Sequence, residues 1–319
     1  MAVLETSRKV AEKSRYVRID GEALVRFCQE MLSKGLAVPP WEDRYHFRGG
    51  DEETIAYFLV LDSLNFCFWP AAEKEKWAIP HESGWVSGYY ALALSLKKAL
   101  ESGTPLIDPE FVVSLSLERL KEILGGRGKL QLLKPRLEIL HELGKVLLER
   151  FDGKAFKLVR AAHGSAVALA RLMAESLASF RDVAEYRGER VYFYKRAQIF
   201  AADLYGSFKG ESWGGFGDME ELTAFADYKL PQVLRKVGIL HYEKPLADRV
   251  DQEILLDAGG AEEVEIRANT IVAVERIRQE LAKLGASVRA FEIDWILWNL
   301  GQEEAFKERP YHRTVTIFY

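Results

Sequence analysis

The residues best suited to chemistry in this 319-residue sequence are four aspartates that occur among apolar residues. Asp62, Asp203 and Asp294 each fall on the apolar side of a segment with helical spacing, and Asp227 lies just before a short helix that contains Pro231. A buried carboxylate without hydrogen bonds is strongly destabilising. We therefore expect these groups either to satisfy backbone groups where helices cross or to line a polar cavity in an apolar wall.

Asp62 and Asn65 lie together on a helix that the spacing predicts from Glu52 to Trp69. They share one stripe with apolar side chains, which are Ile55, Phe58, Leu59, Phe66 and Trp69. Both interpretations remain open for this pair, because hydrogen bonds to the backbone and the lining of a cavity would each explain polar groups in such a stripe.

Asp203 belongs to a second apolar stripe, which it shares with Arg196, Ile199 and Phe200. An internal ion pair between Arg196 and Asp203 is one explanation, and a ligand-binding acid is the other. Lys195 lies beside this stripe, so it adds a cation to whichever site Asp203 forms.

Asp227 lies near the start of the segment Phe225 to Leu240, whose sequence is FADYKLPQVLRKVGIL. Pro231 suits a first helical position, and Asp218 with Glu221 resembles a capping box that opens the preceding helix. The corner between these two helices would bring a carboxylate, a ring and an ammonium to a helix N-terminus, from Asp227, Tyr228 and Lys229. A simple turn with a capping aspartate is the alternative.

Composition excludes several classes of protein. The net charge of -4 argues against sequence-independent binding of duplex nucleic acid. The two cysteines, Cys28 and Cys67, are too few and too isolated for a disulfide framework or a cysteine zinc site. We find no metal-ligand spacing and expect neither metal nor cofactor. No apolar run reaches the length of a membrane span, and the N-terminal residues lack the apolar core of a signal peptide, so we expect a cytoplasmic monomer.

Helical periodicity dominates the rest of the chain, with Gly and Pro between the periodic segments. We expect a single, mainly α domain over residues 1–319, with a central ligand pocket, and with N-terminal helices in 1–40. The apolar C-terminal tail, Tyr311 to Tyr319, is expected to dock on the domain.

Eight strings in the sequence are specific when taken together. They are YHFRGG, FLVLDSLNFCFWP, SFRDV, FYKRAQIFAADLYG, FADYKLPQVLR, EVEIRA, DWILW and PYHRTVTIFY. In this order they resemble the queuosine salvage protein family, the queuosine 5′-phosphate N-glycosylase/hydrolases. The resemblance runs from about Tyr45 to Tyr319, so 41–319 is expected to be the queuosine salvage region.

The resemblance implies a fold like that of helix–hairpin–helix DNA glycosylases, with Phe225 to Leu240 at the corresponding turn. It also implies hydrolysis of queuosine 5′-monophosphate to queuine and ribose 5-phosphate, which returns the base to tRNA modification. The glycine-rich hairpin that such DNA enzymes use to hold a phosphate backbone is lacking, so no stable nucleic acid partner is expected.

Residue roles follow from the resemblance together with the chemistry of the reaction. Asp227 would stabilise the oxocarbenium ion and activate water, with Lys195 beside the ribose or phosphate. The expected substrate-binding residues are His46, Phe47, Asp62, Asn65, Phe66, Asp203, Tyr228, Lys229, Asp294, His312 and Arg313. Two other functions remain open: a base-excision glycosylase that acts on a flipped base, and a non-catalytic module that binds a modified nucleoside or tRNA.

Overall fold

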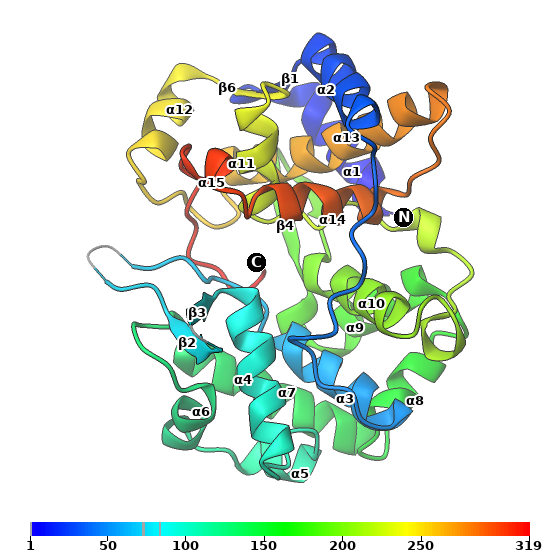
Figure 1. Ribbon diagram of the computed structural model, residues 1–319, viewed down its shortest axis with the longest axis vertical. Coiled ribbons are helices and arrows are strands. Elements are labelled where there is room, and N and C mark those ends of the chain that lie inside the picture. The colour runs from blue at the N-terminus through cyan, green and yellow to red at the C-terminus, as the bar shows by residue number, and fades with distance from the viewer. Residues whose placement is uncertain (1, 72–73, 83) are drawn as a thin grey trace.

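The computed structural model describes residues 2–71, 74–82 and 84–319, and it is mainly helical, as the sequence predicts. None of the described helices is both long and apolar enough to span a membrane. The helices form two groups, one above the other in Figure 1, and each group encloses a hydrophobic core.

The lower group is built from the middle of the chain. Its helices are α3 (Asp51–Ser63), α4 (Tyr89–Glu101), α5 (Pro109–Ser114), α6 (Leu117–Leu124), α7 (Leu133–Arg150), α8 (Ala155–Arg160), α9 (Ala166–Ser176) and α10 (Lys195–Ser207). Helix α3 is apolar on nearly all sides, which is typical of a helix enclosed by others, and it contacts α4, α7, α8 and α10.

The upper group combines the two ends of the chain. Its helices are α1 (Ala2–Lys13), α2 (Gly21–Ser33), α11 (Lys229–Lys236), α12 (Lys244–Asp251), α13 (Ala261–Lys283), α14 (Ala290–Leu300) and α15 (Glu304–Lys307). The strands β1 (Val17–Ile19) and β6 (Leu240–Tyr242) pair antiparallel, with Val17 opposite Tyr242. This pairing fixes the N-terminal helices beside α11 and α13, where they complete the upper core.

Two hairpins and three short 3-10 turns complete the described structure. Strands β2 (Ala78–His81) and β3 (Gly84–Ser87) form one hairpin, and β4 (Val183–Tyr186) and β5 (Glu189–Tyr192) form the other. The 3-10 turns are Ala178–Phe180, Ser212–Gly214 and Met219–Glu221. The C-terminal tail runs from α15 into the space between the two groups, and the Tyr319 side chain is buried there, as the sequence predicts.

Helix α3 ends at Ser63, so the prediction of a helix that continues to Trp69 is wrong. Two buried arginines explain the early end. Arg196 donates to the carbonyl oxygens of Asp62 and Ser63, and Arg136 donates to those of Leu64, Phe66 and Cys67. These guanidinium groups satisfy the carbonyl oxygens beyond the last turn, so the chain can leave the helix without unpaired backbone groups.

The segment before α11 also differs from the prediction. Only a 3-10 turn, Met219–Glu221, follows Asp218, and the Asp218 carboxylate instead accepts the N–H of Ala166 at 2.6 Å at the start of α9. Helix α11 begins at Lys229, two residues before Pro231, because Asp227 Oδ1 accepts the N–H groups of Lys229 and Leu230. A proline is still tolerated at position 231, because the N–H groups in the first turn of a helix have no intrahelical acceptor.

A buried ion pair fixes the position of the segment that leads to Asp227. Arg267 on α13 binds Asp182 with two hydrogen bonds of 2.9 and 2.6 Å, and its Nε donates to the Ala226 carbonyl at 3.1 Å. The guanidinium also lies over the Tyr319 ring, 4.4 Å from its centroid. Asp182 is the acidic partner that a guanidinium buried this deeply requires. Through Ala226 and Tyr319, Arg267 links the residue before Asp227 to the C-terminal tail.

Candidate functional site

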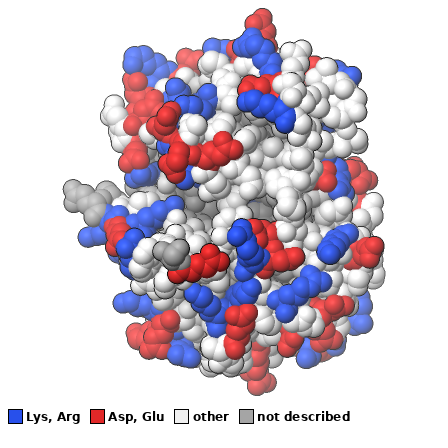
Figure 2. All heavy atoms as spheres, in the orientation of Figure 1, with Lys and Arg blue, Asp and Glu red and all other residues white. Residues whose placement is uncertain are grey.

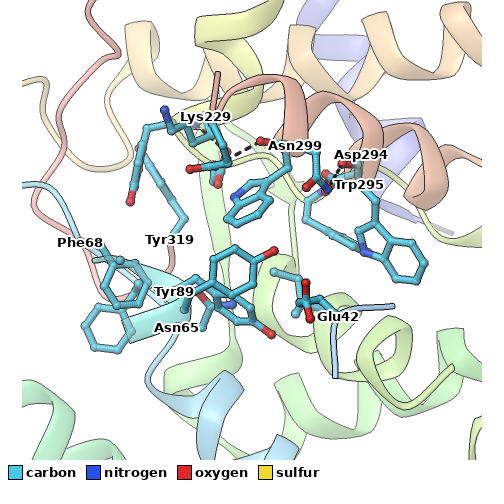
Figure 3. A pocket seen from close by; sticks show the side chains of 18 of the residues that line it. Glu42, Asn65, Phe68, Tyr89, Lys229, Asp294, Trp295, Asn299 and Tyr319 are labelled. Atoms are coloured by element: carbon cyan, nitrogen blue, oxygen red, sulfur yellow. Dashed lines mark hydrogen bonds between the residues drawn. The ribbon is translucent and has the colours of Figure 1, made fainter. Parts of the chain in front are cut away.

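A cavity of about 560 Å³ opens between the two helix groups, and Figure 2 shows it as a hollow in the middle of this face. Aromatic rings wall it: Phe68 and Tyr89 belong to the lower group, Trp295 to α14 and Tyr319 to the C-terminal tail (Figure 3). Polar side chains project between these rings. Such a wall suits a flat ligand that carries hydrogen-bonding groups on its edge.

Most of the residues expected to act lie on this cavity. The lining includes Asp227 and Lys195, expected to be catalytic, and His46, Asn65, Phe66, Asp203, Tyr228, Lys229 and Asp294, expected to bind the substrate. They come from the 34–50 segment, from the chain after α3, from α10 and from the α11 and α14 region, so the fold joins distant parts of the sequence here.

Four other expected residues do not line the cavity. Phe47 packs against the Tyr57 ring, and His312 lies within hydrogen-bonding distance, 3.2 Å, of the Tyr319 hydroxyl. Arg313 is paired with Glu253. Asp62 is fully buried, and neither of its carboxylate oxygens has a hydrogen-bond partner among the described residues. Their expected part in binding stays a prediction, and the inward position of Asp62 is confirmed.

Asp227 is anchored through one oxygen only. Its Oδ1 accepts from the N–H groups of Lys229 at 2.7 Å and Leu230 at 3.1 Å, and Asp227 lines the cavity, so we take Oδ2 as the oxygen available to a ligand. Burial raises the pKa of Asp227 above its ordinary value, whereas Lys195 and the two N–H groups oppose this shift. The site therefore holds a carboxylate that is fixed in position and made more basic.

Lys195 is a buried ammonium at the N-terminus of α10. Its Nζ donates to the Asn65 carbonyl at 3.4 Å, and its backbone N–H donates to Asp182 at 3.2 Å. Burial lowers the pKa of Lys195, and the nearby carboxylates of Asp227, Asp294 and Asp62 act in the opposite direction. Among these acids Asp227 has the largest effect in favour of the charged form of Lys195, so the two groups stabilise each other's charge.

Asp294 lies on α14 across from these groups, and Figure 3 shows it on the α14 side of the cavity. Its Oδ1 accepts the N–H of Phe225 at 2.7 Å. Burial, followed by the neighbouring Asp227, raises the pKa of Asp294 well above its ordinary value. Two neighbouring buried carboxyl groups do not readily ionise together, so Asp294 is the one expected to keep its proton.

Asp203 is not paired with Arg196, so the ion pair that the sequence left open does not form. Arg196 donates to backbone carbonyl oxygens, including that of Ser179. The Asp203 carboxyl instead contacts the Tyr89 hydroxyl at 3.1 Å, and the same hydroxyl lies 2.9 Å from His46 Nε2. Tyr89 and its role as the link between His46 and Asp203 were missed by the sequence analysis.

Two further sets of lining residues were also missed. One face of the α14 end presents Trp295, Trp298, Asn299 and Gln302 to the cavity. The spacing of these residues along the helix was a readable signal. The other set is Lys76 and Lys307, which line the same end of the cavity as the expected Lys229. Their charges contribute to lowering the pKa of Lys229 to about 8, after the larger effect of burial. No spacing links Lys76 and Lys307, because they meet only in the fold.

No set of three or more His, Cys, Asp or Glu side chains in the described residues could hold a metal ion. The chain is thus a mainly helical protein whose two helix groups enclose an aromatic-walled cavity with buried acids and one buried ammonium.

Comparison with known proteins agrees with this description. Residues 45–319 match the profile of the queuosine salvage protein family, and the chain belongs to that family. A protein of Sphaerobacter thermophilus named queuosine 5′-phosphate N-glycosylase/hydrolase is 46% identical over 319 residues, which cover 100% of this chain and 98% of that protein. Proteins with the same name from Dictyostelium discoideum and Mus musculus are each 36% identical over 99% of this chain and 98% of their own length.

Proposed function

We propose that this protein hydrolyses the N-glycosidic bond of queuosine 5′-phosphate and releases queuine and ribose 5-phosphate for salvage into tRNA modification. The full-length similarity to proteins named for this activity supports the reaction. The observation that carries the proposal is the position of Asp227, an anchored carboxylate with one free oxygen on an aromatic-walled cavity, next to the buried ammonium of Lys195.

In the proposed reaction the bond between the sugar and the base breaks, and the base leaves with the bonding electrons. Asp227 stabilises the positive charge that develops at the anomeric carbon and accepts a proton from the attacking water. The oxygen of that water adds to the sugar, and the departing base takes up one proton, so the products balance. Lys195 favours the ionised form of Asp227 against the effect of burial.

The base is proposed to bind against the lower group and the Tyr228 ring. Phe66 and Tyr228 offer flat apolar faces, and the carboxyl of Asp203 and the amide of Asn65 can pair with polar edges. Phe47 and Asp62, which lie behind the lining, would act by supporting it. The expected likeness to helix–hairpin–helix DNA glycosylases and the single-domain organisation are part of the same proposal.

The phosphate is proposed to bind at the end of the cavity where Lys76, Lys229 and Lys307 converge. Each comes from a different segment, and burial lowers the pKa of Lys76, with Lys307 adding to the effect. An anion would relieve the repulsion between these cations. His312 and Arg313 are less suited, since Arg313 is paired with Glu253 and His312 lies against Tyr319.

Replacing Lys76 by Met is expected to raise the KM for queuosine 5′-phosphate by about 10-fold or more, the effect of losing a hydrogen bond to a charged group. The KM for the nucleoside should not change, because the nucleoside lacks the phosphate. Lys74→Met is the matched control, since Lys74 is a neighbouring exposed lysine that does not line the cavity. Equal changes for both substrates would remove Lys76 from the phosphate site.

The proposed activity is tested by incubating the purified protein with queuosine, its 5′-phosphate and queuosine-containing tRNA, and by following free queuine with mass spectrometry. Release from the 5′-phosphate alone, or fastest from it, is the expected result. Release from tRNA would favour the base-excision alternative. Figure 2 shows Lys and Arg interspersed with Asp and Glu around the hollow on this face, which does not favour a nucleic acid partner. Binding without turnover would indicate a non-catalytic module.

A further inference from the structure

Three cavity residues from three separate segments form a continuous chain of hydrogen-bonding contacts. His46 Nδ1 lies 2.6 Å from the carbonyl oxygen of Glu42, and His46 Nε2 lies 2.9 Å from the Tyr89 hydroxyl. The same hydroxyl lies 3.1 Å from Asp203 Oδ2. The chain thus connects a carboxyl group on α10 to an imidazole in the 34–50 segment through the first residue of α4.

The chemistry of these groups limits where the protons can be. A carbonyl oxygen can only accept, so His46 Nδ1 must carry a proton and donate it to Glu42. The Tyr89 hydroxyl has one proton to donate. Either it donates to a neutral His46, and Asp203 is protonated and donates to the Tyr89 oxygen, or His46 is a cation that donates to Tyr89, and Tyr89 donates to an ionised Asp203. Both arrangements satisfy every contact, and they contain the same number of protons.

Burial favours the neutral arrangement in the empty cavity. It lowers the pKa of His46 to about 4 and raises the pKa of Asp203 to about 7, whereas the hydrogen bond with Tyr89 and the charge of Lys195 oppose the rise at Asp203. The titratable and charged side chains from the elements around Asp203 are Tyr57, Asp62, Tyr89, Tyr90, Lys195 and Asp294. Of these, Asp62 is fully buried, and burial, followed by Asp203, raises the pKa of Asp62 well above its ordinary value. Two neighbouring buried carboxyl groups do not readily ionise together. The described structure therefore fits a neutral Asp203.

We propose that His46, Tyr89 and Asp203 form a proton relay that gives Asp203 its negative charge only when a positively charged group of the ligand faces it. The Asp203 O–H proton moves to the Tyr89 oxygen as the Tyr89 proton moves to His46 Nε2. No proton is gained or lost overall, and the hydroxyl of Tyr89 is restored. His46 and Tyr89 act as positioning residues, and Asp203 is the group that contacts the ligand.

This inference rests on the proposed function, because queuine carries a secondary amine that is cationic at neutral pH. A permanently ionised Asp203 in the empty cavity would have to be desolvated next to Asp62, which is costly. The relay avoids that cost and forms the anion together with its counter-ion. It would also make the site selective for a cationic base over guanine-like bases that lack the amine, since only the cation stabilises the ionised arrangement.

The relay can be observed directly at His46. In protein with ¹⁵N-labelled histidine, the imidazole of His46 is expected to be neutral at pH 7 in the empty protein and to give the two-proton imidazolium signature when saturated with queuine. Saturation with 7-deazaguanine, which lacks the amine, should leave His46 neutral. If queuine binds and His46 stays neutral, the relay is wrong while the proposed function is untouched. If queuine does not bind and queuosine 5′-phosphate is not hydrolysed, the proposed function fails instead.

Two matched variants separate the relay from a structural effect. Tyr89→Phe removes the linking oxygen, so His46 should no longer become protonated when queuine binds, and the preference for queuine over 7-deazaguanine should fall by about 10-fold or more, the value of a charge-assisted hydrogen bond. Tyr90→Phe removes the same atom from the adjacent ring of the cavity wall and should leave the His46 response intact. A normal His46 response in Tyr89→Phe, or its loss in Tyr90→Phe, would overturn the relay.

Discussion

Replacing Asp227 by Asn is expected to lower kcat for queuosine 5′-phosphate by about 10³-fold or more, while the nucleotide still binds. The amide oxygen of Asn can accept from the N–H groups of Lys229 and Leu230 as Asp227 Oδ1 does, so the first turn of α11 should keep its shape. The negative charge that stabilises the oxocarbenium ion is lost. Such a change affects the transition state more than the ground state, so kcat should fall with little change in the substrate Kd.

Asp294→Asn and Asp203→Asn are the matched controls for this result. Both carboxyl groups are buried on the same cavity, and burial raises the pKa of each, so in the empty cavity the neutral amide is close to the state that each already has. Asp203→Asn removes the charge proposed to face the cationic base, so its effect is expected on binding and not on the hydrolytic step. Single-turnover hydrolysis by the three variants should show by far the greatest loss for Asp227→Asn. A rate near that of the unaltered protein for Asp227→Asn, with a large loss in either control, would transfer the role to that acid.

The helical periodicity of the sequence was sufficient to predict that three particular acids point inward. Asp62, Asp203 and Asp294 were identified because each interrupts an apolar stripe, and all three are buried. Periodicity gives the direction of a side chain and does not give its depth. Asp203 and Asp294 line the cavity, whereas Asp62 lies behind the lining, and no residue that the structure describes is hydrogen-bonded to either of its carboxylate oxygens. That difference depends on how α3 and α10 pack, which a single stripe cannot reveal.

Two of the missed parts of the site come from segments without a repeating pattern. Tyr89 is the first residue of α4, and Lys76 lies beside the β2–β3 hairpin. Their contacts join residues that are far apart in the sequence, such as Tyr89 and Asp203. Tertiary packing alone creates such contacts, so propensity and spacing carry no signal for them.

The errors in the local structure have the same origin. The helix after Glu52 stops at Ser63 because Arg136 and Arg196, from other helices, satisfy the backbone carbonyl oxygens beyond its end. Asp218 was expected to cap a helix that follows it in the sequence. Its carboxylate instead accepts hydrogen bonds from Ser165 and Ala166 at the start of α9, because these residues lie beside Asp218 in the fold. In each case a side chain from a distant segment replaced a hydrogen bond that the local sequence had suggested.

Replacing Lys195 by Met is expected to lower kcat by about 10²–10³-fold and to move the acid limb of the pH–rate profile to higher pH. Lys195 acts to lower the pKa of Asp227 against the effect of burial. Without the ammonium the pKa of Asp227 rises, and because hydrolysis needs the ionised carboxylate, activity is lost at a higher pH as the solution is acidified. Measuring kcat from acid to neutral pH for both proteins checks the shift and its sign.

Lys229→Met is the matched control, since it removes another ammonium from the same cavity. Lys229 also lowers the pKa of Asp227, but less than Lys195 or the two backbone N–H groups do. The acid limb should therefore move less for Lys229→Met than for Lys195→Met. A purely structural role for Lys195, through its hydrogen bond to the Asn65 carbonyl, predicts lower activity at every pH with the limb unmoved. A limb that stays in place would therefore remove Lys195 from the electrostatics of the reaction and leave it as a support for the chain after α3.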